Sequence, residues 1–294
     1  MANLKEIRTR IASVTTTKQI TSAMKMVSAA KLKKAQDAIV QFRPYASKMD
    51  EIIGNLSTNS SLDASSVLVK ERPVKKVLLV VYTSNRGLCG AFNNNVIKAS
   101  IQLSFEKYER QLSAGNVHFL AIGKKGAEFL KGKKFEIIST HNDLFEAPCY
   151  ENVVPVADKI IDLFVNGQYD NVTIIYNQFK NAGVQVLTEE QLLPVKPKKK
   201  KDEFLKQNDD FIFEPGINEI YNDLVPKSLK IQLYKALLDS FASEHGARMT
   251  AMHKATDNAS EMIKDLTLTY NKARQAAITG EILEIVGGAE ALKG

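Results

Sequence analysis

The chain has 294 residues, of which 44% are hydrophobic, and it carries a net charge of +7 with only two cysteines, Cys89 and Cys149. This apolar content suffices for one or two globular domains, and no stretch approaches the 18 consecutive apolar residues of a membrane-spanning helix. The charged, amphipathic N-terminus lacks the apolar region of a secretory signal, and the two cysteines predict a reducing compartment and no disulfide framework.

The first 53 residues have the composition of one long helix, with no glycine and a single proline, Pro44. The apolar residues that define its predicted stripe are Leu4, Ile7, Ile11, Val14, Ile20, Met24, Val27, Leu32, Ala35, Ile39, Phe42 and Met49. Their spacing of three and four is that of one helical face, interrupted by three threonines at 15–17. The Ser/Thr-rich residues 57–66 predict a linker, so the first predicted domain is 1–57.

The middle of the chain alternates between short apolar runs and helical stretches. The predicted strands are 77–82, 117–122, 136–139, 172–179 and 184–188, and the predicted helices are 94–112, 127–131 and 153–165. Strands that alternate with helices indicate βαβ units in a mostly parallel sheet. The turn at 181–183 predicts that the last strand returns as an antiparallel edge. We therefore expect a Rossmann-like α/β domain over 74–216, with Lys198–Lys201 in a solvated loop and Phe211–Phe213 in one more edge strand.

The last part of the chain again has the composition of a long helix. Residues 227–279 contain one glycine and no proline. Pro226 suits the first position of a helix, so we expect this helix to start there, within a domain spanning 222–288. Two long terminal helices around a compact middle predict an antiparallel coiled coil. The stripe that the last helix contributes is rich in Ala, Met, Ser and Thr, which fix the register of a coiled coil less firmly than Leu and Ile do.

Positive charge is concentrated in the first helix. Residues 1–48 carry ten Lys and Arg against two acidic residues, whereas the remaining 246 residues sum to a charge of −1. A basic helix predicts acidic partners. Nucleic acid, anionic lipid and an acidic protein surface all qualify.

The sequence contains no convincing catalytic, cofactor or metal site. The loop 84–90 follows the first strand, but it lacks the third glycine of a dinucleotide fingerprint and the Gly-Lys-Ser/Thr of a P-loop, which favours a structural turn. Cys89 has no histidine at a motif spacing, so a buried thiol is preferred to a nucleophile. His245 and His253 are two helical turns apart, too far to share a metal, and we expect them to be solvated or interfacial.

Several motifs resemble the γ subunit family of the F-type ATP synthases. They are Lys5-Glu6-Ile7-Arg8, Lys18-Gln19-Ile20-Thr21, Ala23-Met24-Lys25-Met26-Val27, Arg86-Gly87-Leu88-Cys89-Gly90, Glu244-His245-Gly246-Ala247-Arg248-Met249 and the segment from Ile278-Thr279-Gly280-Glu281 to Gly288-Ala289. The family usually has Asp before the arginine of the loop, where this chain has Asn85. The likeness runs from end to end and is weakest over 196–210.

The resemblance implies a rotor shaft that couples proton flow through the membrane c-ring to ATP synthesis or hydrolysis on the β subunits. Its implied partners are the α3β3 hexamer, the ε subunit and the c-ring, with no catalytic site, cofactor or metal of its own. It also implies a peripheral location on the cytoplasmic face of a bacterial inner membrane. The implied contacts to the hexamer are Met24, Lys25, Arg274, Gln275, Thr279, Glu281 and Glu284, and those to the c-ring or ε are Phe211 and Phe213. Met24 could equally pack in the seam.

Two other functions remain open at this point. The basic first helix would also suit a coiled-coil nucleic-acid-binding protein, although residues 1–41 lack the aromatic residues that stack on bases. An enzyme using Cys89 on the α/β domain is the other alternative.

Overall fold

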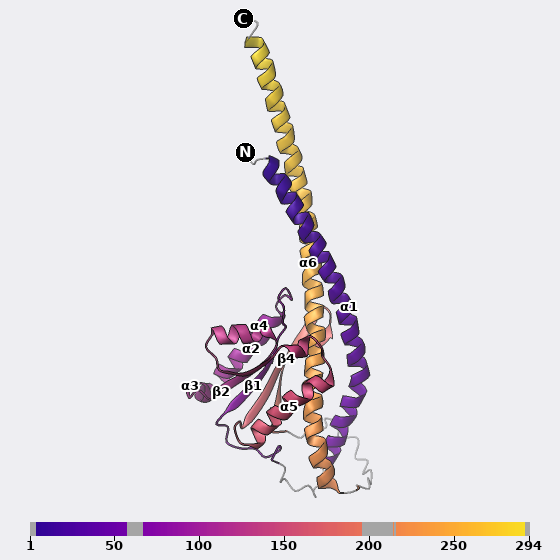
Figure 1. The fold of residues 1–294 in the computed structure, drawn as a ribbon, viewed down its shortest axis with the longest axis vertical. Helices are drawn as coiled ribbons and strands as arrows, with labels where there is room; N and C mark the ends of the chain where they lie inside the picture. Colours follow the sequence, from indigo (N-terminus) through magenta and orange to yellow (C-terminus); the bar gives the residue numbers. More distant parts are fainter. Residues whose placement is uncertain (1–3, 58–66, 196–213, 215, 292–294) are drawn as a thin grey trace. The chain divides into compact units, whose positions relative to one another are not determined.

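The computed structural model describes residues 4–57, 67–195, 214 and 216–291 and divides into two compact units. Residues 1–28 and 248–294 form the first, which we call the helical unit, and residues 29–247 form the second, the α/β unit. Helices α1 (Leu4–Ser57) and α6 (Ile217–Ala291), which Figure 1 draws in indigo to purple and in orange to yellow, each contribute one part to each unit.

The α/β unit is built on a five-stranded sheet with strand order β3-β2-β1-β4-β5. Its strands are β1 (Val77–Tyr82), β2 (Val117–Ile122), β3 (Ile137–His141), β4 (Asn171–Asn181) and β5 (Val184–Leu193). The first four are parallel, and β5 pairs antiparallel with β4. This arrangement confirms the predicted α/β class with its antiparallel edge.

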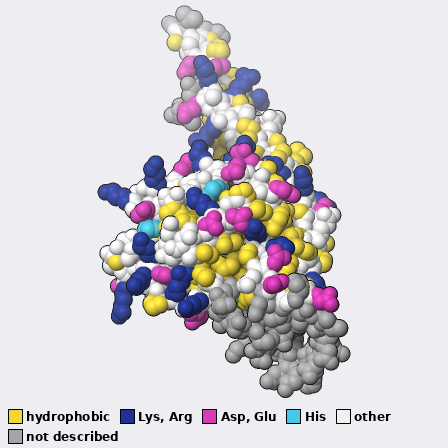
Figure 2. Space-filling model, turned by 60° about the horizontal axis from the view of Figure 1, so that its bottom comes forward, with side chains coloured by type: hydrophobic (Ala, Val, Ile, Leu, Met, Phe, Trp, Pro, Cys, Tyr) yellow, Lys and Arg dark blue, Asp and Glu magenta, His cyan; other side chains and the backbone are white. Residues whose placement is uncertain are grey.

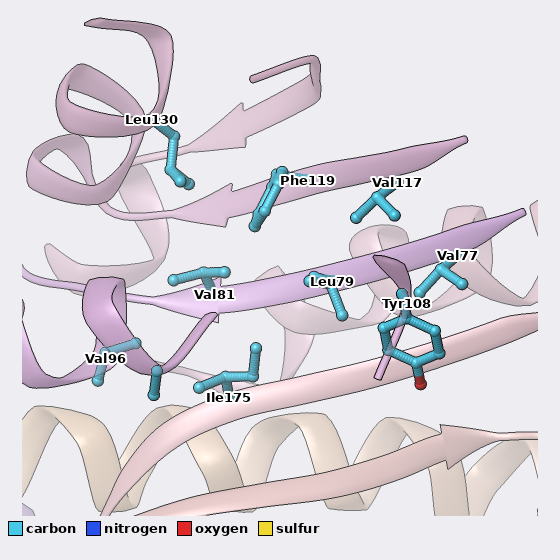
Figure 3. Close-up of a cluster of buried hydrophobic side chains, with 10 residues drawn as sticks. Val77, Leu79, Val81, Val96, Tyr108, Val117, Phe119, Leu130 and Ile175 are labelled. Atoms are coloured by element: carbon cyan, nitrogen blue, oxygen red, sulfur yellow. The ribbon is translucent and has the colours of Figure 1, made fainter. Parts of the chain in front are cut away.

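One face of the sheet is covered by α2 (Phe92–Glu106) and α4 (Lys124–Gly132). The side chains of Leu79, Val81, Val96, Phe119 and Leu130 pack together there and are almost fully buried (Figure 3). Every residue of β1 is buried, so this strand faces apolar layers on both sides. A continuous apolar run is the expected sequence of such a central parallel strand.

The opposite face is covered by α5 (Tyr150–Val165) and the first part of α6. Tyr82, on β1, donates a hydrogen bond from its hydroxyl to the backbone carbonyl of Leu233 on α6, at 3.1 Å. Lys230 on α6 and Asp158 on α5 form an ion pair of 2.7 Å. The last helix therefore begins as a layer of the α/β unit and is not only one half of a coiled coil.

Two predicted helix boundaries were wrong. The expected helix 94–112 is divided into α2 and α3 (Glu109–Ser113) at Tyr108, whose backbone leaves the helical region. The buried Tyr108 hydroxyl donates to Oδ1 of Asn171 at 3.0 Å, so the break lets this side chain reach the core. Helix α6 begins at Ile217 and not near Pro226, because Tyr221 and Val225 continue the buried face upstream of that proline.

Other boundaries differ by a few residues. The helices expected at 127–131 and 153–165 are α4 and α5, and the strand expected at 136–139 is β3, followed by a 3-10 turn, η1 (Asp143–Phe145). The predicted strand Phe211–Phe213 and loop Lys198–Lys201 lie outside the described residues.

Candidate functional site

The helical unit consists of the start of α1 packed against the end of α6. The hydroxyl oxygens of Thr21 and Thr256 are 2.9 Å apart, and Lys25 Nζ lies 3.4 Å from His253 Nδ1. Residue numbers rise along α1 while they fall along α6, so the two helices run antiparallel. Continuing this pairing toward the chain ends places Leu4 opposite about Ala273.

The predicted stripe on α1 is wrong between Val14 and Leu32. Ile20 and Val27 were expected in the seam, but 55% and 58% of their surface is exposed. Thr21 and Ser28 are buried in their place. These two residues keep the spacing of three and four that starts at Leu4, whereas Ile20 and Val27 each lie one residue away, about 100° around the helix.

The two buried hydroxyl groups are satisfied without water. Thr21 Oγ1 donates toward the carbonyl of Lys18, and Ser28 Oγ donates to the carbonyl of Met24 at 2.7 Å. A hydroxyl bonded to its own helix can be buried at little cost. The seam is therefore narrow and partly polar here, and the neighbouring aliphatic side chains are left for another surface.

The residues expected to contact a partner through α1 are only partly accessible. Met24 and Lys25 are half-buried. His253, which faces Lys25, also lies 3.2 Å from Asp257 Oδ2. The exposed apolar side chains beside them, Ile20, Met26 and Val27, were not predicted as contact residues. If the predicted stripe had been continued from Val14 with a strict spacing of three and four residues, these three side chains would have been predicted outside the seam.

The end of α6 is exposed on every side. The residues expected to contact partners here are exposed, namely Arg274, Gln275, Thr279, Glu281 and Glu284. Thr279 Oγ1 donates to the carbonyl of Gln275, within its own helix, at 2.9 Å. Large aliphatic side chains in the same segment are 47% to 72% exposed, namely Ile278, Ile282, Leu283, Ile285 and Val286. We call residues 274–291 the α6 tip. It begins beyond the residue that lies opposite Leu4, the first described residue of α1.

The loop after β1 is a closed turn. Asn93 Oδ1 accepts from the backbone N–H of Ser84 at 2.9 Å, and Asn93 Nδ2 donates to Cys89 Sγ at 3.2 Å. Cys89 is buried against Phe92 and Ala247. Leu88 and Gly90 adopt positive φ angles of 62° and 59°, which close the loop. The loop thus packs as a structural turn with a buried thiol.

The histidines do not form a metal site in the described part of the chain, where no group of three or more His, Cys, Asp or Glu has the arrangement to hold an ion. His253 is exposed, as expected, but His245 is buried, with its ring 4.6 Å from that of Phe241. The expectation of a solvated or interfacial His245 was therefore wrong for this structure. Phe211 and Phe213 lie outside the described residues.

The remaining surface features are the distribution of charged side chains and the apolarity of the helices. Lys5, Arg8 and Arg10 are exposed on α1. On the face drawn in Figure 2, Lys and Arg side chains are interspersed with Asp and Glu, with apolar side chains between them. Among the residues placed by the structure, no helix is long and apolar enough to cross a membrane.

Comparisons with known proteins cover the whole chain. The family described as ATP synthase matches residues 3–292. The ATP synthase gamma chain of Flavobacterium psychrophilum is 58% identical over 295 residues, covering 100% of both chains, and that of Cytophaga hutchinsonii is 50% identical, covering 99% of both.

Solved structures show the same fold. A chain of the central stalk and c-ring structure of the Tetrahymena thermophila mitochondrial ATP synthase is 27% identical, with a TM-score of 0.57, covering 80% of this chain and 99% of that one. A chain of the Euglena gracilis mitochondrial ATP synthase has a TM-score of 0.67 at 21% identity, covering 98% and 94%.

Proposed function

The chain belongs to the ATP synthase gamma-chain family, and from this membership we propose how its terminal helices act in the enzyme. Membership makes it a rotor subunit of an ATP synthase. It does not support the alternative of a basic coiled-coil nucleic-acid-binding protein.

The α6 tip is the part of the rotor that we propose to turn inside a hexamer of α and β subunits. The observation that carries this proposal is the exposure of every side of a helix with five large aliphatic side chains. In proteins, helices gain most of their stability from packing against other elements. The unpacked helix of the α6 tip therefore needs a surrounding protein surface. Aliphatic contacts are non-directional, so they suit an end that must turn against its neighbours.

The start of α1 is proposed to contact an acidic loop of the β subunits. Lys5, Arg8 and Arg10 are exposed, and Lys25 lies at the edge of the seam. Ile20 and Val27 are exposed apolar side chains of the same part of α1. Exposed ion pairs contribute about 0 to 1 kcal/mol each, so such contacts can break and re-form during every rotation.

Catalysis is proposed to reside on the β subunits, with this chain acting as a non-catalytic coupling and regulatory subunit. The buried Cys89 and the closed loop around it support this assignment. The ε subunit and the c-ring are the proposed partners of the α/β unit. Through them the chain would lie at the cytoplasmic face of a bacterial inner membrane without entering it.

The test is to assemble the chain with its α and β subunits and to truncate it after Ala273. Truncation removes the α6 tip but none of the α/β core, so we expect a folded subunit that assembles and delivers markedly less torque in single-molecule rotation. A matched control ends the chain after Ala291. Loss of helical circular dichroism well beyond the deleted residues, or undiminished torque, would contradict the proposal.

A further inference from the structure

A cavity of about 230 Å³ lies within the α/β unit, where α1, α6 and β4 meet. Phe42 and Ile39 of α1 and Ile231 of α6 supply apolar walls, and Gln178 of β4 supplies an amide. This volume accommodates a small organic molecule. The proposed role of the rotor makes no use of it.

Two cations and one carboxylate line the same cavity. Arg43 lies on α1, and Lys235 and Asp239 lie one helical turn apart on α6. Within the described ranges, neither cation has a carboxylate within 4.0 Å, although both act electrostatically on Asp239. The two positive charges are therefore only partly compensated by protein groups.

Asp239 supplies a single negative charge against the two cations. Its side chain is 4% exposed, and burial raises its pKa to about 6, against the attraction of Lys235 and Arg43 and a hydrogen bond from the backbone of Phe179. Glu190 on β5 also raises the pKa of Asp239, and it accepts a hydrogen bond from the Tyr176 hydroxyl on β4 at 3.1 Å. Because two cations and one carboxylate line the cavity, its lining groups carry one excess positive charge beside apolar walls.

We propose that this cavity binds a small organic anion, with its carboxylate or phosphate group at Arg43 and Lys235 and its apolar body against Phe42 and Ile231. Charge-assisted hydrogen bonds to Arg and Lys favour such groups, and the apolar walls select against fully hydrated inorganic ions. Because α1, α6 and β4 all line the cavity, an occupant contacts three elements that are distant in sequence.

The binding experiment uses the full-length chain and ligand-observed NMR with benzoate and phenyl phosphate as probes. Inorganic phosphate tests the need for an apolar body, and benzylamine tests the sign of the charge. We expect both aromatic anions to bind at least tenfold more tightly than either comparator. Equal binding of inorganic phosphate or of benzylamine would overturn the proposal, as would no detectable binding of either aromatic anion at 10 mM, roughly the weakest affinity that a specific site of this kind would show.

Variants locate the site. Arg43→Gln and Lys235→Gln should each weaken benzoate binding about tenfold, since a hydrogen bond to a charged group contributes about 1.5 kcal/mol or more. Lys34→Gln, at an exposed lysine of the same helix outside the cavity, is the matched control. Circular dichroism verifies folding, and Ala46→Phe, which fills the cavity and keeps both cations, should abolish binding independently. Unchanged affinity in folded Arg43→Gln, Lys235→Gln and Ala46→Phe chains would overturn the assignment.

Discussion

Replacing Asp239 with asparagine should stabilise the α/β unit at neutral pH. The carboxyl group is buried, and desolvation raises its pKa from 3.8 to about 6, despite the opposing effects of Lys235 and Arg43. A raised pKa means that the folded state binds the proton more tightly than the unfolded state does. The contribution of Asp239 to stability is therefore most favourable below pH 4 and is lost as pH rises through 6.

The size of the effect follows from the shift. About two pKa units correspond to about 3 kcal/mol at 1.36 kcal/mol per unit. Asparagine resembles the protonated carboxyl group and can still accept the hydrogen bond from the backbone of Phe179. We expect the Asp239→Asn chain to exceed the unaltered chain in unfolding free energy by up to about 3 kcal/mol at pH 7.5, and by little at pH 3.5.

The assay is urea denaturation of the full-length chain followed by far-ultraviolet circular dichroism between pH 3.5 and 7.5. The quantity of interest is the difference between the two chains at each pH, because this removes the titration of all other groups. Asp265→Asn, at an exposed aspartate of the same helix, is the control and should give a difference near zero throughout. A difference for Asp239→Asn that is constant across this range, or that favours aspartate above pH 6, would refute the reasoning.

Three further sets of substitutions test the packing. Gly123→Ala should destabilise the α/β unit by about 3 kcal/mol or more, because a Cβ there would lie 1.8 Å from the Thr83 carbonyl oxygen and φ is +100°. Gly115→Ala is the control: φ is +70° but the Cβ would enter open space, so this change should cost only about 1 kcal/mol. Thermal melts of both chains distinguish the clash from backbone strain alone. Tyr82→Phe should cost about 1 kcal/mol, since it removes the buried hydrogen bond to Leu233, and an unchanged urea midpoint would count against that bond. Thr21→Val or Thr256→Val alone should lower the unfolding free energy by up to about 1 kcal/mol, whereas the two changes together should leave it nearly unchanged. A double-mutant cycle without coupling would show that the two hydroxyls do not interact.

Local patterns were sufficient to predict the order and type of most elements. The apolar run of β1, the alternation of strands with helices and the turn at 181–183 each have a local physical cause, and the sheet follows them. The long terminal helices were equally predictable, since segments nearly free of glycine and proline favour helix over their whole length.

Tertiary packing decided what the local signals left undetermined. The break at Tyr108 exists because its hydroxyl meets Asn171, which lies 63 residues away in sequence. Pro226 tolerates a helical position because the buried face of α6 extends upstream through Tyr221 and Val225.

The same difference between local patterns and tertiary packing applies to the candidate contact surface on α1. Composition alone predicted a basic first helix, because charge is a property of the residues themselves. Which side of α1 faces α6 was not determined in this way, since Thr21 and Ser28 are poorer seam residues than Ile20 and Val27 when judged singly. In an unbroken helix each residue is rotated by a fixed angle from the one before it, so packing of the flanking turns determines where every side chain points. In α1 this places Thr21 and Ser28 in the seam and Ile20 and Val27 on the surface.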